Sequence, residues 1–342
     1  MKERTLNSMI NRNNAFSMII QDPEQANDIS PILKFLSIGE DLIIFKTDGI
    51  YRMLTAEKID PNATNLETKH SYEKLYSIGT SSPYVARIII QFEKILNLIS
   101  NEESNKREII TYLWNTNKLL LDSYMLVDTI IQQINPLSLK CDKIIEANKN
   151  KSDIPSLPKI PYLENQVRTF LNNSKLLLIE IFRSLHIFFN MPMSDRKCAH
   201  FDKHIKWLEN TLGKEHPISN MLNHDITWIQ ILSESRNAIE HPNKGQKLYI
   251  YNFKLQPGNK FSQPTWSYDL TKKLGIKSDP TDLANDLKVY IDNIFTLFEE
   301  IILLIISDKL KEHKLLTLYK ISEETIDKQC PINYQIGLKN SL

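Results

Sequence analysis

Glycine, cysteine and glycine-rich motifs are scarce in this sequence of 342 residues. With 8 glycines, a fold built on many tight turns is disfavoured, and no Walker loop, GxGxxG or GxSxG motif occurs. The 3 cysteines are scattered and form no CxxC pair. They suit free thiols in a reducing compartment better than a disulfide framework. The sequence therefore gives no sign of a nucleotide loop, a serine-hydrolase elbow or a disulfide-stabilised scaffold.

Long apolar segments and a charge excess are also missing. The most apolar stretch, Ile301 to Ile306, is about six residues long, whereas a helix that crosses a bilayer needs ~20. The N-terminus lacks the apolar region of a signal peptide. The formal net charge is +1, so the whole-chain balance does not indicate nucleic acid or membrane binding. We expect a cytoplasmic protein without a membrane partner. Any sign of a nucleic-acid ligand must then come from a short segment of the sequence and not from its overall charge.

Helical periodicity dominates the sequence, and we predict a mainly α protein in two parts. Residues 1–145 are expected to form a helical module of unknown role, with a short β-hairpin near 41–54. Residues 146–162 are polar and then proline-rich, so a helix cannot easily continue there, and we predict a linker. The helices expected in the module cover about 83–100 and 105–134.

The segments after the linker carry apolar residues at helical spacing, as an antiparallel helical bundle requires. They cover about 163–190, 200–212, 218–240 and 281–310. Between the last two, alternating apolar and polar residues around a Pro-Gly turn predict an inserted β-hairpin over 247–269. We assign residues 163–320 to the bundle and 321–342 to a tail.

The sequence SESRNAIEHPNKG ends the third of these helices and combines three unusual features. Arg236 falls on the apolar stripe, where a guanidinium needs a carboxylate, a partner surface or a ligand phosphate. Pro242 should end the helix at Glu240 or His241, where the helix dipole favours a protonated imidazole. Asn237 precedes His241 by one turn, about 40° away around the helix. Arg236 for phosphate, His241 for proton transfer and Asn237 for orientation form a minimal set for phosphodiester cleavage by an RNA 2′-hydroxyl.

This segment resembles the motif of HEPN domains, which are four-helix bundles. Their motif is an Arg, a polar residue and a His four to six residues after the Arg, at the end of the third helix. Arg236-Asn237-x-x-x-His241 fits this pattern, and the resemblance covers roughly the C-terminal half.

The resemblance implies a metal-independent endoribonuclease that leaves 2′,3′-cyclic phosphate and 5′-hydroxyl ends. Family members act in antiviral defence, abortive infection or toxin–antitoxin systems. The resemblance also implies an RNA substrate, a homodimer with a composite active site, and an antitoxin or regulatory partner. Other members have lost catalysis, so the alternative is a non-catalytic module that binds RNA, a nucleotide or a protein.

The segment from His241 to Asp279 is rich in lysines interleaved with aromatic residues. This composition suits single-stranded RNA. The candidate RNA-binding residues are Lys244, Lys247, Lys254 and Lys260. Alternatively, the hairpin packs one face on the bundle and its lysines protect the strand edges. For the aromatic residues we favour this packing interpretation.

The motif residues also have a purely structural interpretation. Arg236 would then pair with a buried acid of its own chain, such as Glu180 or Glu299. His241 would be a plain helix cap. The position of the Arg236 guanidinium distinguishes the two interpretations.

Metal binding has one candidate in this sequence. Cys198, His200 and His204 have the residue types of a zinc site, and the two histidines share one face of a helix. A fourth ligand is not evident, because His216 or His224 would have to fold in. We therefore predict no metal site and no cofactor, and we expect surface positions for the histidines.

Overall fold

The structure is a computed structural model that describes residues 30–99, 102–192, 200–311 and 313–339. Helices make up the larger part of the described chain, and several small β-sheets accompany them. The chain divides into two compact units. Unit 1 contains the chain up to Asn117 and from His313 onward, and unit 2 contains Lys118–Glu312. Unit 2 is thus one continuous segment, flanked in the sequence on both sides by unit 1.

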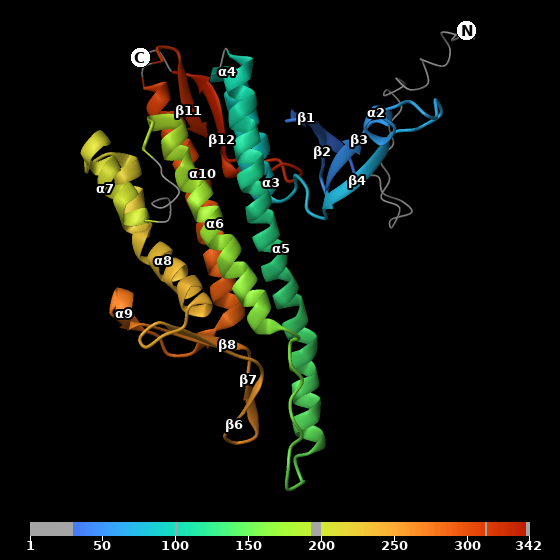
Figure 1. The fold of residues 1–342 in the computed structure, drawn as a ribbon, viewed down its shortest axis with the longest axis vertical. Helices are drawn as coiled ribbons and strands as arrows, with labels where there is room; N and C mark the ends of the chain where they lie inside the picture. Colours follow the sequence, from blue (N-terminus) through green and yellow to red (C-terminus); the bar gives the residue numbers. More distant parts are fainter. Residues whose placement is uncertain (1–29, 100–101, 193–199, 312, 340–342) are drawn as a thin grey trace. The chain divides into compact units, whose positions relative to one another are not determined.

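Unit 1 contains an antiparallel sheet with the strand order β1-β2-β3-β4 (Figure 1). Its strands are β1 (Ile32–Ile38), β2 (Asp41–Lys46), β3 (Ile50–Leu54) and β4 (Ser71–Tyr76). The hairpin predicted near 41–54 is confirmed as β2 and β3, which are joined by a turn where the Lys46 N–H donates to the Gly49 carbonyl (2.9 Å). The prediction of a helical module is wrong over residues 32–76, because β1 and β4 extend the hairpin into a four-stranded sheet. An isolated hairpin is marginal in water, and the added strands help to bury its apolar residues.

The helices of unit 1 follow the sheet and the short helix α2 (Ala56–Ile59). The predicted helix over 83–100 is confirmed as a continuous helical run of α3 (Pro83–Val85), the π-helical turn η1 (Ala86–Ile90) and α4 (Gln91–Ile99). The next helix, α5 (Glu103–Ala147), is longer than predicted because it continues through Pro136. Proline removes one backbone hydrogen bond, but Ile134 and Cys141 on either side are buried and maintain the helix.

The C-terminal residues form a hairpin instead of the predicted tail. Its elements are β11 (Leu316–Lys320), the 3-10 turn η2 (Glu323–Thr325) and β12 (Tyr334–Leu338), with β11 and β12 antiparallel. The side chain of Gln91 in α4 is fully buried, and its Oε1 accepts hydrogen bonds from the N–H groups of Asn333 (2.7 Å) and Tyr334 (2.8 Å). These bonds attach the end of the chain to unit 1.

Unit 2 contains the four predicted bundle helices, with bounds close to the predicted ones. They are α6 (Leu163–Phe189), α7 (Phe201–Leu212), α8 (Pro217–Glu240) and α10 (Leu283–Leu310). Figure 1 shows α6 and α10 running in the same direction and α8 in the opposite direction. Their apolar stripes meet in the core, where Phe170, Leu178, Leu232, Ile294 and Phe298 are almost fully buried.

The predicted linker over 146–162 is part of unit 2. After α5 ends, residues 148–162 have no regular secondary structure, but Leu157 and Ile160 are buried. The Asn252 side chain binds both backbone groups of Ile160, its N–H and its carbonyl, at 3.0 Å each. The two units therefore divide near residues 117 and 312, and not within 146–162. This differs from the prediction because the second half of α5 and the proline-rich segment belong to the same compact unit as the bundle.

The inserted β structure between α8 and α10 confirms the predicted hairpin over 247–269 and extends it. Its elements are β5 (Lys247–Tyr251), β6 (Lys254–Gln256), β7 (Lys260–Ser262), β8 (Thr265–Leu270), α9 (Thr271–Leu274), β9 (Ile276–Lys277) and β10 (Thr281–Asp282). The sheet order is β10-β8-β5, with β9 also paired to β8, and β6–β7 form a separate two-stranded arm. Trp266 attaches the sheet to α10, since its Nε1 donates to Asp286 (2.7 Å).

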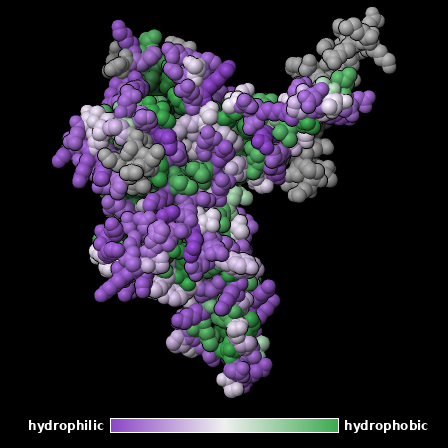
Figure 2. All heavy atoms as spheres, viewed as in Figure 1, coloured by the Kyte–Doolittle hydropathy of each residue, from purple (hydrophilic) through white to green (hydrophobic). Residues whose placement is uncertain are grey.

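The surface of the protein is largely polar on the face shown in Figure 2, with smaller hydrophobic patches among hydrophilic residues. Large apolar side chains are concentrated instead in the interiors of the two units. Over the described residues, none of the helices combines the length and the apolar character that crossing a membrane requires.

Candidate functional site at the end of helix α8

The predicted motif lies at the C-terminal end of α8, and the helix ends where the sequence indicates. Glu240 is the last helical residue, and His241 is the C-cap with φ −134° and ψ 62°. The backbone N–H of His241 still donates to the Asn237 carbonyl (2.9 Å). Pro242 follows directly and disfavours helical geometry at His241. The prediction that the helix stops at Glu240 or His241 is confirmed.

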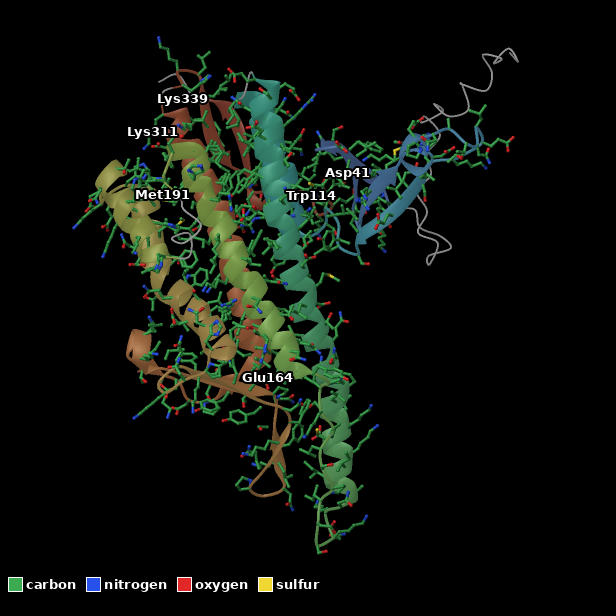
Figure 3. The ribbon with its side chains drawn as sticks, in the orientation of Figure 1. Asp41, Trp114, Glu164, Met191, Lys311 and Lys339 are labelled. Carbon is green, nitrogen blue, oxygen red and sulfur yellow. The ribbon has the colours of Figure 1, made fainter. Side chains whose placement is uncertain are left out.

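Arg236 is anchored to α6 by a neutral side chain. It is half-buried, and its Nε donates a hydrogen bond to Asn172 Oδ1 (2.8 Å). The Nδ2 of Asn172 in turn donates to Glu240 Oε1 (3.1 Å). Residues four apart share one face of a helix, so Arg236 and Glu240 both reach Asn172. Asn172 lies in the early turns of α6, the helix that begins beside Glu164 in Figure 3.

This geometry bears on the alternative in which Arg236 pairs with Glu180 or Glu299. Glu180 accepts two hydrogen bonds from Arg183, at 2.8 and 2.9 Å. Within the described part of the chain, Arg236 forms no ion pair with either acid, and its hydrogen-bond partner is the amide of Asn172. The Nη groups of Arg236 have no hydrogen-bond partner among the described residues, so they can donate to an external anion.

Asn237 does not contact the His241 ring in this structure. Its Oδ1 accepts a hydrogen bond from Lys175 Nζ (2.9 Å), and its Nδ2 donates to Glu234 Oε1 (3.2 Å). The other oxygen of Glu234 accepts from Gln246 Nε2 (3.2 Å). Asn237 therefore links a lysine of α6 to a carboxylate of α8, and it brings a second cation beside the motif.

A tight turn connects the end of α8 to β5. The backbones of Asn243 and Gln246 exchange two hydrogen bonds of 3.0 Å. Lys272 holds the turn from α9, because its N–H donates to the Gly245 carbonyl (2.8 Å) and its Nζ to Asn243 Oδ1 (3.1 Å). Gly245 has φ +72°, and a Cβ there would lie 2.8 Å from Thr271 Oγ1. Only glycine suits this position, so the turn fixes the sheet to the motif.

The imidazole of His241 is exposed and makes no hydrogen bond to the described residues. Its backbone is fixed, since its carbonyl accepts from Asn243 Nδ2 (3.1 Å). On an ideal helix, two residues five apart point about 140° away from each other. Arg236 and His241 therefore leave α8 in different directions. A phosphate that contacts both must bind beyond the helix end or between two copies of the chain.

The four candidate RNA-binding lysines are all exposed. Lys244 lies in the turn after His241, and Lys247 begins β5. Lys254 and Lys260 lie on the β6–β7 arm. In the register of this arm Lys260 is opposite Gln256, so Lys254 and Lys260 share one face.

The aromatic residues of the insertion divide into two groups. Trp266 and Phe253 are buried, as the packing interpretation expects, and Phe253 contacts Phe261 with ring centroids 6.0 Å apart. Tyr249 and Tyr251, by contrast, are 39% and 40% exposed. The packing interpretation therefore does not account for these two tyrosines.

The zinc candidates do not assemble in the described residues. His204 is 5% exposed instead of lying on the surface, because it faces the bundle and packs against Phe182 and Phe201, with ring centroids 5.6 and 6.3 Å away. His200 is exposed, and Cys198 lies outside the described residues. No group of three His, Cys, Asp or Glu residues that could hold a metal occurs in the described ranges.

Sequence reasoning did not identify the residues that support the motif. Asn172 and Lys175 come from α6, more than sixty residues before the motif. In the sequence, these two residues are marked only by their place on the face of α6 that packs against α8. That face can be recognised only when it is known that α6 and α8 pack together. Glu234 precedes Arg236 by two residues, so the sequence shows that it lies near the motif. Its hydrogen bonds to Asn237 and Gln246 cannot be seen in the sequence.

The site thus combines two cations, an exposed imidazole and hydrogen-bonded carboxylates at one end of a helix. Arg236 and Lys175 favour an anionic ligand, and His241 can accept or donate a proton. No protein-family model, curated protein or solved structure matches this chain. The chemical assignment therefore rests on the site itself.

Proposed function

We propose that unit 2 is a HEPN-type domain that cleaves RNA without a metal ion. Arg236 binds and stabilises the phosphate, and His241 transfers protons. Asn237 is a positioning residue that holds Lys175 Nζ beside the phosphate site. The biological setting that the motif suggests is antiviral defence or a toxin–antitoxin system.

One observation carries this proposal. The guanidinium of Arg236 is fixed through Nε by Asn172, while its Nη groups have no hydrogen-bond partner among the described residues. At the end of the same helix, the His241 imidazole is exposed. A purely structural arginine on an apolar stripe would be expected to meet a carboxylate. Here a neutral amide holds it, so no carboxylate bonded to the guanidinium offsets its charge toward an anion.

The reaction follows from these groups. The 2′-hydroxyl oxygen of the RNA attacks the adjacent phosphorus, and the bond from phosphorus to the 5′-oxygen of the next nucleotide breaks. The 2′-hydroxyl loses its proton and the 5′-oxygen gains one; His241 serves one of these transfers and water serves the other. Arg236 stabilises the charge of the pentavalent phosphate. The products are a 2′,3′-cyclic phosphate and a 5′-hydroxyl.

A homodimer with a composite site is part of this proposal. Because Arg236 and His241 point about 140° apart on an ideal helix, one copy presents them in different directions. Two copies that meet at the ends of their α8 helices can bring Arg236 of one chain near His241 of the other. Mixing Arg236→Ala with His241→Ala protein should then restore partial cleavage, whereas each variant alone is inactive.

The first test is cleavage of RNA by the purified protein with excess EDTA. His241→Ala should abolish cleavage. The matched control is His224→Ala, because His224 is also an exposed histidine of α8 but lies about three turns before the motif. Equal loss in both variants would contradict a specific role for His241, and retained cleavage in His241→Ala would overturn the mechanism.

The second candidate function is a non-catalytic module that binds RNA, a nucleotide or a protein partner. The exposed Tyr249 and Tyr251 on the inserted sheet favour it, since they present a contact surface beside the motif. This function predicts that Arg236→Ala and His241→Ala leave the cellular phenotype intact, while changes in the insertion abolish it.

A further inference from the structure

The outer face of β5 presents two tyrosines to solvent. Tyr249 and Tyr251 are 39% and 40% exposed, whereas Leu248 and Ile250, which alternate with them, are half-buried. In the sheet register, Tyr249 lies opposite Ser267 and Tyr251 opposite Thr265. Small side chains therefore flank both rings on β8. The rings are also next to a free edge, because within the described residues β5 pairs with β8 alone.

The sheet beneath the tyrosines is firmly held. Its other face contains Trp266, whose ring lies 6.0 Å from that of Tyr290 in an edge-on arrangement. Asp286 accepts hydrogen bonds from Trp266 Nε1 (2.7 Å) and Thr281 Oγ1 (2.5 Å). These contacts fix the sheet to α10. A rigid aromatic surface loses little conformational freedom when a ligand binds to it.

The surroundings of the tyrosines carry positive charge. Lys244 and Lys247 are exposed between His241 and the first tyrosine, and Lys254 follows the second. Lys247 lies opposite Asp269 in the register, so that acid balances part of the charge. Hydrogen bonds from Thr271, with smaller contributions from nearby lysines, hold the pKa of Asp269 below its usual value. The remaining lysines can contact phosphate groups.

The surface is also tied to the candidate site. The Asn243–Gln246 turn, held by Lys272, separates His241 from Lys247 at the start of β5. Gln246 is buried and bound to Glu234 of α8. A ligand on the tyrosines is therefore held in a fixed relation to the end of α8.

We propose that Tyr249 and Tyr251 form a stacking surface for two unpaired bases of a single-stranded RNA that extends to His241. Alternate residues of a strand are about 7 Å apart, whereas stacked bases in a duplex rise about 3.4 Å per nucleotide. The two rings thus suit an extended strand with unstacked bases. Base-paired RNA buries its base faces within the duplex and cannot stack on them. That this RNA is also the substrate rests on the proposed function.

The test measures binding of a short fluorescein-labelled oligouridine by fluorescence anisotropy. The His241→Ala protein is used so that the RNA stays intact. Adding Tyr249→Ala or Tyr251→Ala should weaken binding between about fivefold and about a hundredfold, the range for loss of one base–aromatic stack. The matched variants Tyr249→Phe and Tyr251→Phe keep the ring and should bind like the parent. A blunt-ended RNA duplex without unpaired bases should bind more weakly and should not respond to the tyrosine variants.

A second measurement does not depend on removing a side chain. Tyr251→Trp keeps an aromatic ring, and its additional indole emission should change when oligouridine binds. No change at saturating RNA would overturn the stacking surface. Leu255→Ala, which removes another exposed apolar side chain of the insertion, should leave binding unaltered.

The outcomes separate this inference from the proposed function. If the wild-type protein cleaves RNA but the tyrosine variants bind like the parent, the stacking surface is wrong and the ribonuclease stands. If binding depends on the tyrosines but cleavage never occurs, the surface stands and the ribonuclease is wrong. If the protein binds no RNA, the stacking surface is overturned.

Discussion

Asn172 is the residue through which α6 holds Arg236, so its replacement tests the organisation of the site. Its Oδ1 accepts from Arg236 Nε (2.8 Å), and its Nδ2 donates to Glu240 Oε1 (3.1 Å). Asn172→Ala removes both hydrogen bonds. The guanidinium then loses the contact that fixes its direction, although its charge remains.

The magnitude follows from the number and exposure of these bonds. A hydrogen bond to a charged group contributes about 1.5–3 kcal/mol. Asn172, Arg236 and Glu240 are all half-buried, so water replaces part of each lost bond, and we expect a loss of about 2 kcal/mol in total. For a domain of the size of unit 2, this lowers the melting temperature by about 4–8 °C. RNA cleavage should fall by about 10- to 100-fold, because a small misplacement of a catalytic group is costly.

Thermal unfolding followed by circular dichroism, together with cleavage rates, measures both effects. The neighbouring Asn173 provides the control, since it is also half-buried but its side chain forms no hydrogen bond within the described residues. Asn173→Ala should change stability by less than about 0.5 kcal/mol. If the two variants have the same stability and the same cleavage rate, the anchoring of Arg236 by Asn172 is refuted.

Two further predictions concern the packing of unit 2. Burial alone would raise the pKa of Asp308, but hydrogen bonds from Lys311, labelled in Figure 3, and from His216 outweigh it and lower that pKa. The charged form of Asp308 therefore stabilises the fold at pH values above the ordinary pKa of a carboxyl group. This contribution is lost as the pH falls through the lowered pKa. Asp308→Asn should lower the melting temperature at neutral pH but much less in strong acid, and an equal deficit at both would contradict the assignment. Trp266→Phe removes the hydrogen bond to Asp286 (2.7 Å) and part of a buried ring. Urea unfolding should show a loss of at least about 1.5–3 kcal/mol. An unchanged free energy of unfolding would show that neither contact stabilises the unit.

The bundle helices and the end of α8 could be predicted because their signals are local. Apolar residues at helical spacing define α6, α8 and α10, and Pro242 marks the end of α8. The outward position of His241 follows from that helix end. The anchoring of Arg236 could not be predicted, since Asn172 is one of several polar residues on α6 and its role depends on how the two helices pack.

The N-terminal sheet and the C-terminal hairpin could not be predicted in full, because their signals are not local. β2 and β3 are short apolar strands around a tight turn, whereas the places of β1 and β4 are set by pairing along the sheet. The C-terminal hairpin is joined to unit 1 through the buried Gln91, which binds a segment more than two hundred residues away. A polar residue within an apolar helix gives no indication of such a partner. Long-range pairing therefore limited the prediction of unit 1.

The most direct test of the proposed ribonuclease uses an RNA oligonucleotide with a single 2′-deoxy substitution at the cleavage position. The wild-type protein in EDTA should cleave the all-ribose oligonucleotide to 2′,3′-cyclic phosphate and 5′-hydroxyl ends, and it should leave the substituted bond intact. Cleavage of the substituted bond, or products with 5′-phosphate ends, would contradict attack by the 2′-hydroxyl and the roles given to Arg236 and His241.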